Sequence, residues 1–126
     1  MSRSIFSNDA PRPIGPYSQA MECGNLVFVS GQLGIDPSTG QLVEGGIGAE
    51  TTRCLKNINA ILSLLNLSLK DVVKTIVFMT DLTEFKEMNL VYASFFQLST
   101  PARSVVEVSR LPLGAKIEIE AIASFC

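Results

Sequence analysis

The apolar side chains between Gly48 and Leu65 recur every three or four residues, and this stripe limits the fold more than any other feature. The spacing gathers them on one side of a helix, which is the pattern of a helix lying on a sheet. The stripe consists of Cys54, Leu55, Ile58, Ile61, Leu62 and Leu65. Asn66 follows the stripe directly and is predicted to end the helix, because asparagine tolerates the left-handed conformation of a helix terminus.

Segments rich in β-branched residues alternate with the helical patterns and predict strands. The predicted strands cover residues 26–30, 72–79, 103–108 and 116–123. A second apolar stripe, from Phe85 to Phe96, predicts another helix, with Asp81 as its N-cap and Glu84 as the capping partner. Elements in this order favour an α+β fold, a mixed sheet with two helices on one face.

The composition excludes several classes of protein. The 126 residues fit one domain, residues 1–126, with no linker or repeat. Apolar residues make up 47% and charged residues 17%, which argues against disorder and leaves apolar surface for a subunit interface. A net charge of −2 provides no basic field, so nucleic acid is not an expected partner. No apolar run approaches the roughly 18 residues of a membrane helix, so no membrane partner is expected.

The sequence contains no histidine. This removes the commonest general base, the commonest metal ligand and every Ser-His or Cys-His nucleophile pair. Cys23, Cys54 and Cys126 lie far apart and form no CxxC motif, so no metal site is expected and a reducing compartment is favoured. The first residues form no secretory signal, so the expected location is the cytoplasm, with an organelle such as the mitochondrion as the alternative.

Two carboxylates share one face of the last predicted strand. Glu118 and Glu120 alternate with apolar residues and lie about 7 Å apart along the strand. They fit either a solvated outer face or, for one of them, a general base in a cleft. Arg103 suits either a rim ion pair or a bidentate clamp on a substrate carboxylate. The turn through Gly114 is expected to bring the Arg103 and Glu118 strands side by side, with their register open.

Four other residues lie at turns, at strand ends or on the second helix, where binding groups often occur. They are Tyr17, Ser30, Gly31 and Asn89. Ordinary turn chemistry, and helix-surface filling for Asn89, are equally open explanations from the residues alone. Ser30 stands outside a G-x-S-x-G motif and has no histidine, so it can hydrogen-bond but not serve as an activated nucleophile.

Five motifs occur in an order and spacing that resemble a known family. They are Ala10–Ala20, Ser30–Gln32, the Asp81–Tyr92 series, Pro101–Ser104, and Leu111–Pro112 followed by Ile117–Ala123. Together they resemble the Rid family of reactive intermediate deaminases, also called YjgF, and its RidA branch, from about Phe6 to Ala123. The resemblance implies a chorismate-mutase-like fold. It also implies a homotrimer with a central barrel of sheets and a site between each pair of neighbouring subunits.

The activity implied by the resemblance is hydrolysis of 2-imino acids, such as 2-iminopropanoate and 2-iminobutanoate, to 2-oxo acids and ammonia without a cofactor. By the resemblance, Arg103 holds the substrate carboxylate and Glu118 positions or activates water. The positions that match pocket-lining residues of the family are Tyr17, Ser30, Gly31 and Asn89. Glu120 matches a less central position and is assigned a structural role. Val105 departs from the branch, in which many members carry cysteine.

Two other classes of function stay open at the level of the sequence. A regulatory module could bind small carboxylates without turnover; it would keep Arg103 but would not need Glu118, so the presence of both favours catalysis. Chaperone-like and ribonuclease activities are reported for some relatives. The absence of histidine and of a basic field argues against a ribonuclease.

Overall fold

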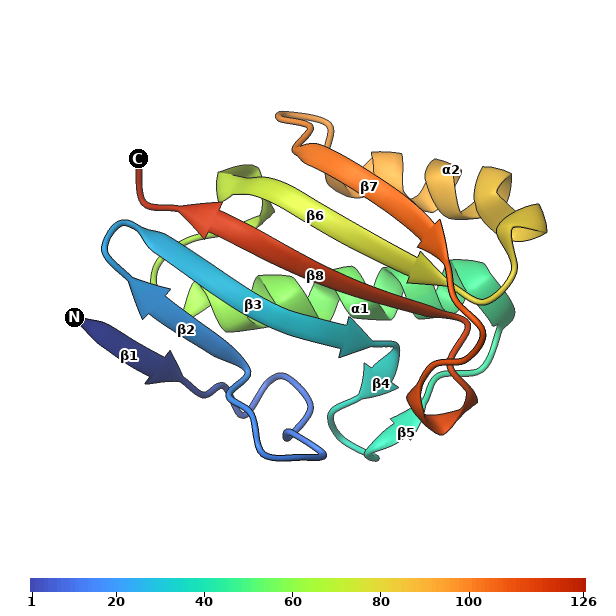
Figure 1. The fold of residues 1–126 in the computed structure, drawn as a ribbon, viewed down its shortest axis with the longest axis horizontal. Helices are drawn as coiled ribbons and strands as arrows, with labels where there is room; N and C mark the ends of the chain where they lie inside the picture. The colour runs from blue at the N-terminus through green and yellow to red at the C-terminus, as the bar shows by residue number, and fades with distance from the viewer.

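The computed structural model describes residues 1–126 as a six-stranded sheet with two α-helices on one face (Figure 1). The sheet comprises β1 (Ser2–Ile5), β2 (Ala20–Cys23), β3 (Leu26–Leu33), β6 (Val72–Met79), β7 (Ala102–Glu107) and β8 (Ile117–Ser124). The other elements are β4 (Ile35–Asp36), β5 (Gln41–Leu42), α1 (Gly46–Ser63), α2 (Phe85–Phe95) and the 3₁₀ turns η1 (Leu69–Asp71), η2 (Leu82–Glu84) and η3 (Pro112–Gly114). The predicted α+β fold, a mixed sheet with two helices on one face, is confirmed.

The predicted apolar stripe of α1 forms the centre of the core. Five of its six members are fully buried against the sheet, and Leu65 packs partly buried at the edge of the same cluster. Each such aliphatic side chain stabilises the fold by about 1.5–3 kcal/mol. Asn66 has a φ of 59°, the left-handed conformation predicted for the end of this helix. No helix of the chain is long and apolar enough to cross a bilayer.

The start of the second helix differs from the prediction in one detail. Asp81 does cap it, but the carboxylate accepts hydrogen bonds from the backbone N–H and hydroxyl of Thr83, at 2.9 and 2.6 Å. Glu84 contributes only its backbone N–H, which donates to the Asp81 carbonyl at 3.2 Å. The expected capping partnership of Asp81 with the Glu84 side chain is therefore wrong, because the chain enters α2 through the tighter η2 turn.

The strands that carry Arg103 and Glu118 are not neighbours, so this prediction is also wrong. The sheet order is β1-β2-β3-β8-β6-β7, and β6 separates β7 from β8 (Figure 1). The reason is the connection through α2, which returns the chain parallel to β6 on its outer side. β8 then inserts antiparallel between β3 and β6.

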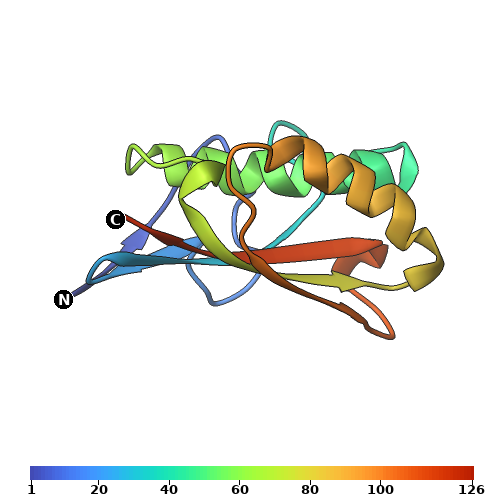
Figure 2. The ribbon, with the colours of Figure 1, turned by 90° about the horizontal axis from the view of Figure 1, so that it is seen from above.

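The two faces of the sheet have different surroundings. The helices lie on one face, and no helix covers the other (Figure 2). Ile117 and Ile119 of β8 are fully buried on the helix face. Because successive side chains of a strand alternate, Glu118 and Glu120 belong to the face without helices, which we call the open face.

Asn57 fastens α1 to the end of β3 and to β4. Its buried amide nitrogen donates to the Leu33 and Ile35 carbonyls at 3.2 and 3.0 Å, and its amide oxygen accepts from the Arg53 side chain at 3.0 Å. Both carbonyls lie where β3 ends and β4 begins, at residues that pair with Glu118 and Leu42 in the two sheets. Asn57 therefore adds hydrogen bonds that fix the helix to this corner of the chain.

Replacement of Asn57 by leucine should lower the free energy of unfolding by about 1–3 kcal/mol, because two carbonyls lose their donors inside the protein. Urea unfolding followed by circular dichroism measures the change. The matched control is Lys56→Ala on the exposed side of the same helix, with an expected change within about 0.5 kcal/mol. Equal stabilities of the two variants would contradict the anchoring role of Asn57.

Candidate active site

A pocket on the open face gathers most of the residues singled out in the sequence. Its volume is about 300 Å³. We call it the Glu118 pocket; it is lined by Ile14, Tyr17, Ser30, Gly31, Leu33, Pro112, Glu118 and Glu120. Apolar side chains form one part of its wall, and two carboxylates and two hydroxyls form the other. Such a cavity suits a small ligand that has both an apolar and a polar part.

A bulge in β3 shapes this pocket. The register between β3 and β8 shifts between Val29 and Gln32. Ser30 and Gly31 therefore lie opposite β8 without regular pairing partners. The Ser30 hydroxyl donates to the Ser18 carbonyl at 2.6 Å, which fixes the bulge to the N-terminal loop. A Cβ atom at Gly31 would lie 2.7 Å from the carboxyl carbon of Glu118. Glycine is thus required here by close approach, since any side chain would displace the carboxylate.

Glu118 is half-buried and accepts no hydrogen bond within the chain. Burial is the main cause that raises the pKa of its carboxyl group above the ordinary value for glutamate, and the charge of Glu120 raises it further. A carboxylate with a raised pKa and no partner is a better proton acceptor than a solvated one. The solvated-face interpretation of Glu118 therefore does not describe its surroundings.

The N-terminal loop reaches the pocket because Gln19 holds it. The buried Gln19 side chain donates to the Ser7 and Pro11 carbonyls at 3.1 and 2.8 Å and accepts from the Ser7 N–H at 2.6 Å. Tyr17 follows in the same loop, and its hydroxyl accepts from the Ile14 N–H at 3.2 Å. The phenol ring is thereby fixed at the mouth of the Glu118 pocket, with 45% of the residue exposed.

Arg103 lies in a different place, against α2. Its Nη1 donates to the amide oxygen of Asn89 at 2.8 Å, and its Cζ lies 4.8 Å from the Tyr92 ring centroid and 5.7 Å from that of Phe85. The Tyr92 hydroxyl is in turn hydrogen-bonded to Thr75 at 2.7 Å. We call these residues the Arg103 cluster. The guanidinium is oriented by an amide and two rings but has no carboxylate partner, so most of its N–H donors are available.

The Glu118 pocket and the Arg103 cluster lie on opposite faces of the sheet. Arg103 pairs with Thr75 across to β6, and Thr75 is buried under the helices. Glu118 points to the open face. One chain therefore brings Tyr17, Ser30, Gly31 and Glu118 together, and separately Arg103 and Asn89, but does not bring the two groups to each other.

The sequence did not indicate a binding role for some residues of the Glu118 pocket and of the Arg103 cluster. Leu33 carries no signal in the sequence beyond apolar character, and Pro112 stands in a turn and in one of the family motifs without an assigned role. Glu120 shares its face with Glu118, and that alternation was the available signal for a place in the pocket. Phe85 and Tyr92 belong to the apolar stripe of α2 and were interpreted as core; Tyr92 is indeed buried but also lies under the guanidinium.

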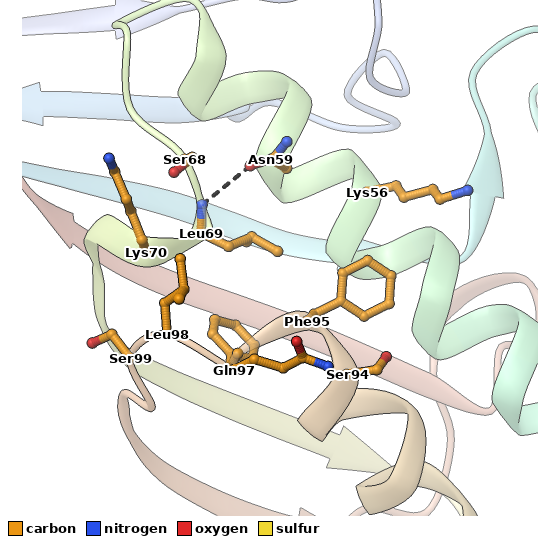
Figure 3. Close-up of a pocket in the computed structure, with 11 residues that line it drawn as sticks. Lys56, Asn59, Ser68, Leu69, Lys70, Ser94, Phe95, Gln97, Leu98 and Ser99 are labelled. Atoms are coloured by element: carbon orange, nitrogen blue, oxygen red, sulfur yellow. Dashed lines mark hydrogen bonds between the residues drawn. The ribbon is translucent and has the colours of Figure 1, made fainter.

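A larger pocket, of about 420 Å³, lies elsewhere, between α1, η1 and the end of α2 (Figure 3). Leu69 and Phe95 contribute apolar surface, and Lys56 and Lys70 stand on two sides of it with their ammonium groups directed apart (Figure 3). It holds no carboxylate and none of the predicted site residues. We therefore choose the smaller pocket as the candidate site, because polar groups converge there, and not by its volume. The chain contains no group of three potential metal ligands among His, Cys, Asp and Glu.

Comparison with known proteins identifies the family of this chain. The family model described as endoribonuclease L-PSP matches residues 7–125. The chain belongs to this family. It is the Rid or YjgF family whose motifs the sequence resembles, and that resemblance is confirmed.

Three members illustrate the relationship. A RutC family protein of Pyrococcus horikoshii is 53% identical, with 98% of each chain covered. The mouse 2-iminobutanoate/2-iminopropanoate deaminase is 45% identical, with 94% of this chain and 88% of the mouse protein covered. The crystal structure of E. coli TdcF with bound serine is 41% identical and superimposes with a TM-score of 0.94 over 98% of this chain and 99% of TdcF. The family thus includes imine deaminases, while other close relatives carry only the general family name.

Gly31→Ala should disturb the pocket because the added methyl group meets the Glu118 carboxylate. The expected loss in the free energy of unfolding is below about 1 kcal/mol, because the methyl group meets the flexible end of the Glu118 side chain, which can move aside. Gly15→Ala is the matched control, because its methyl group would contact the Tyr17 ring at an ordinary 3.5 Å. Thermal unfolding and a crystal structure of each variant are the measurements. An unmoved Glu118 carboxylate in Gly31→Ala would contradict the close approach.

Proposed function

We propose that this protein hydrolyses 2-imino acids, with 2-iminopropanoate and 2-iminobutanoate as representative substrates, to 2-oxo acids and ammonia. The observation that carries the proposal is a pair of unpartnered opposite charges. The guanidinium of Arg103 is held by Asn89 without a carboxylate, and Glu118 lies half-buried without a cation. The proposed unit is one family domain of residues 1–126.

Arg103 supplies the substrate clamp in this proposal. The guanidinium forms two parallel hydrogen bonds with a carboxylate, which fixes both the position and the plane of the bound acid. Asn89 and the Tyr92 ring hold the guanidinium before substrate arrives, so little side-chain freedom is lost on binding. The clamp then places the imine carbon next to the water that Glu118 activates.

Glu118 acts on the attacking water. As the water oxygen bonds to the imine carbon, Glu118 accepts a proton from that water, and the carbon–nitrogen double-bond electrons move to nitrogen. Glu118 then returns the proton to this nitrogen. Glu118 next takes the proton of the new hydroxyl group and passes it to the same nitrogen. The carbon–nitrogen bond then breaks, ammonia leaves and the oxygen becomes the carbonyl of the 2-oxo acid. An imine carbon is already electrophilic, so neither a covalent nucleophile nor a cofactor is required.

A second copy of the chain completes the site in this proposal. The open face carries apolar side chains that no element of the chain covers; Phe28 is 43% and Val106 41% exposed, and Ile76, Phe78 and Ile122 are half-buried. Association of copies through this face would bury these side chains. It would also bring the Arg103 cluster, on edge strand β7 and α2, to a neighbour's Glu118 pocket. The family resemblance favours a homotrimer with a central barrel and three such sites.

The relatives support the same substrate class. The mouse relative is named for 2-iminobutanoate and 2-iminopropanoate, and TdcF binds serine, which shares the carboxylate and the adjacent nitrogen-bearing carbon of these imines. The chain has a net charge of −2 and no histidine, so the endoribonuclease activity in the family's description is not the one we propose. The three cysteines are free thiols, which agrees with action in the reducing cytoplasm.

Arg103→Ala should abolish most of the proposed activity. We expect kcat/KM to fall by about 100-fold, because the substrate carboxylate loses its charged partner. A threonine dehydratase supplies 2-iminobutanoate, and semicarbazide competes for it, so active protein suppresses semicarbazone formation. Arg110→Ala, at an exposed arginine outside both groups, is the control and should match wild type. Carboxylate binding by a wild-type protein that shows no turnover would instead favour the regulatory module.

Mixing two inactive variants tests the shared site. Arg103→Ala and Glu118→Gln should each be nearly inactive. Trimers that contain both variants should regain about one third of wild-type activity, because one of the three sites in such a ring joins the two intact halves. Co-expression with two affinity tags isolates the mixed assemblies, and the semicarbazide assay measures their activity. Absence of recovery in verified mixed assemblies would show that the two residues do not act across copies.

A further inference from the structure

We propose that Glu120 is a positioning residue for Glu118: its negative charge, in the same pocket and on the same strand face, keeps Glu118 a proton acceptor strong enough to activate water. The role of Glu120 in catalysis rests on the proposed function, but the test of its effect on Glu118 does not. This role also departs from the structural role that the sequence suggested for Glu120.

Both carboxylates lie in one cavity. Glu118 and Glu120 are separated by a single residue on β8, both are half-buried, and both line the Glu118 pocket. Glu120 lies opposite Ile76 of β6 on one side. On its other side is the bulge of β3 at Ser30 and Gly31. Neither neighbouring strand places a charged side chain beside Glu120, so the negative charge of Glu120 acts mainly on Glu118.

Within one chain, the cations around this pair are directed elsewhere. Lys116, two residues before Glu118, has its charge near Glu50 and Asp81. On β6 the nearest cation of the open face is Lys74, which lies opposite Ile122 and directs its ammonium group to Ser104 at 3.5 Å. In the N-terminal loop, Arg12 is turned onto the Phe6 ring, with its Cζ 5.5 Å from the centroid. The only ion pair of the chain lies far away on β1 and β2.

The remaining titratable groups near Glu118 do not balance its charge either. Tyr17, at the mouth of the pocket, is a phenol and supplies no positive charge. On the helix face below β8 lies Cys54, whose fully buried thiol has its pKa raised well above the usual value and so stays uncharged. In the proposed assembly the partner's Arg103 faces the pocket, but the bound substrate carboxylate neutralises it during the reaction.

A neighbouring negative charge makes protonation of Glu118 easier and thus makes its carboxylate more basic. Burial alone would raise the basicity of the Glu118 carboxylate by excluding water. It would also leave less space for the water that attacks the imine. Glu120 raises it while the pocket stays open to water. The Glu118 pocket thus combines a strong base with access for its second substrate, in a chain that has no histidine for this task.

The test is the titration of the Glu118 carboxyl carbon by NMR in the assembled, substrate-free protein. Glu120→Gln keeps the shape but removes the charge, and should lower the midpoint of the Glu118 titration by about half a pH unit or more. The acidic limb of the pH dependence of kcat/KM should move to lower pH by the same amount. At the plateau the rate should fall by about two- to threefold, because a weaker base accepts the proton from water less readily.

Two further variants separate charge from structure. Glu120→Asp keeps the charge and should retain most of the wild-type midpoint, and Glu44→Gln removes an exposed charge outside the pocket and should leave the midpoint unchanged. An unchanged midpoint in Glu120→Gln, or equal shifts in the Asp and Gln variants, would overturn the inference. Because the titration needs no substrate, it decides this point even if the wild-type protein proves to have no deaminase activity.

Discussion

The insertion of β8 between β3 and β6 is the constraint on which the rest of this structure depends. Its alternating sequence sends isoleucines and alanines to the helices and two glutamates to the open face. The same insertion moves β7 to the edge of the sheet, because β6 already occupies the other side of β8. Arg103 therefore stands on an edge strand beneath α2, where a neighbouring molecule can approach it. The core, the proposed base Glu118 and the proposed clamp Arg103 are all placed by this one strand arrangement.

Much of the fold follows from local patterns. The α1 stripe, the left-handed Asn66 and the alternation of β8 are determined by neighbours within a few residues, and these predictions are confirmed. The order of the strands depends on contacts between distant segments, so the expectation that β7 and β8 pair was wrong. The choice of Thr83 over Glu84 at the α2 cap depends on a turn type that the spacing does not distinguish.

The candidate site also combines features that the local sequence predicts with features that depend on contacts between distant segments. Motif order identified the residues of the Glu118 pocket and of the Arg103 cluster. The sequence could not show that the two groups lie on opposite faces, because the face of each side chain depends on the register between strands. The role of Gly31 likewise depends on a bulge that places a backbone atom against a carboxylate. Leu33, at the end of β3, and Pro112, in η3, join the pocket through contacts between distant segments, and their apolar side chains did not indicate a place there.

The separation of Arg103 from Glu118 has a chemical consequence for the proposed reaction. If both stood on one face of one chain, they would form an ion pair that occupied the clamp and lowered the pKa of the base. Placed on opposite faces, the guanidinium keeps free donors and Glu118 keeps its raised pKa. In the proposed assembly the two charges meet across a gap that the substrate fills, and its carboxylate satisfies the arginine. In that proposal, dividing the site between copies would prevent an ion pair within one chain and would leave the guanidinium donors for the substrate carboxylate.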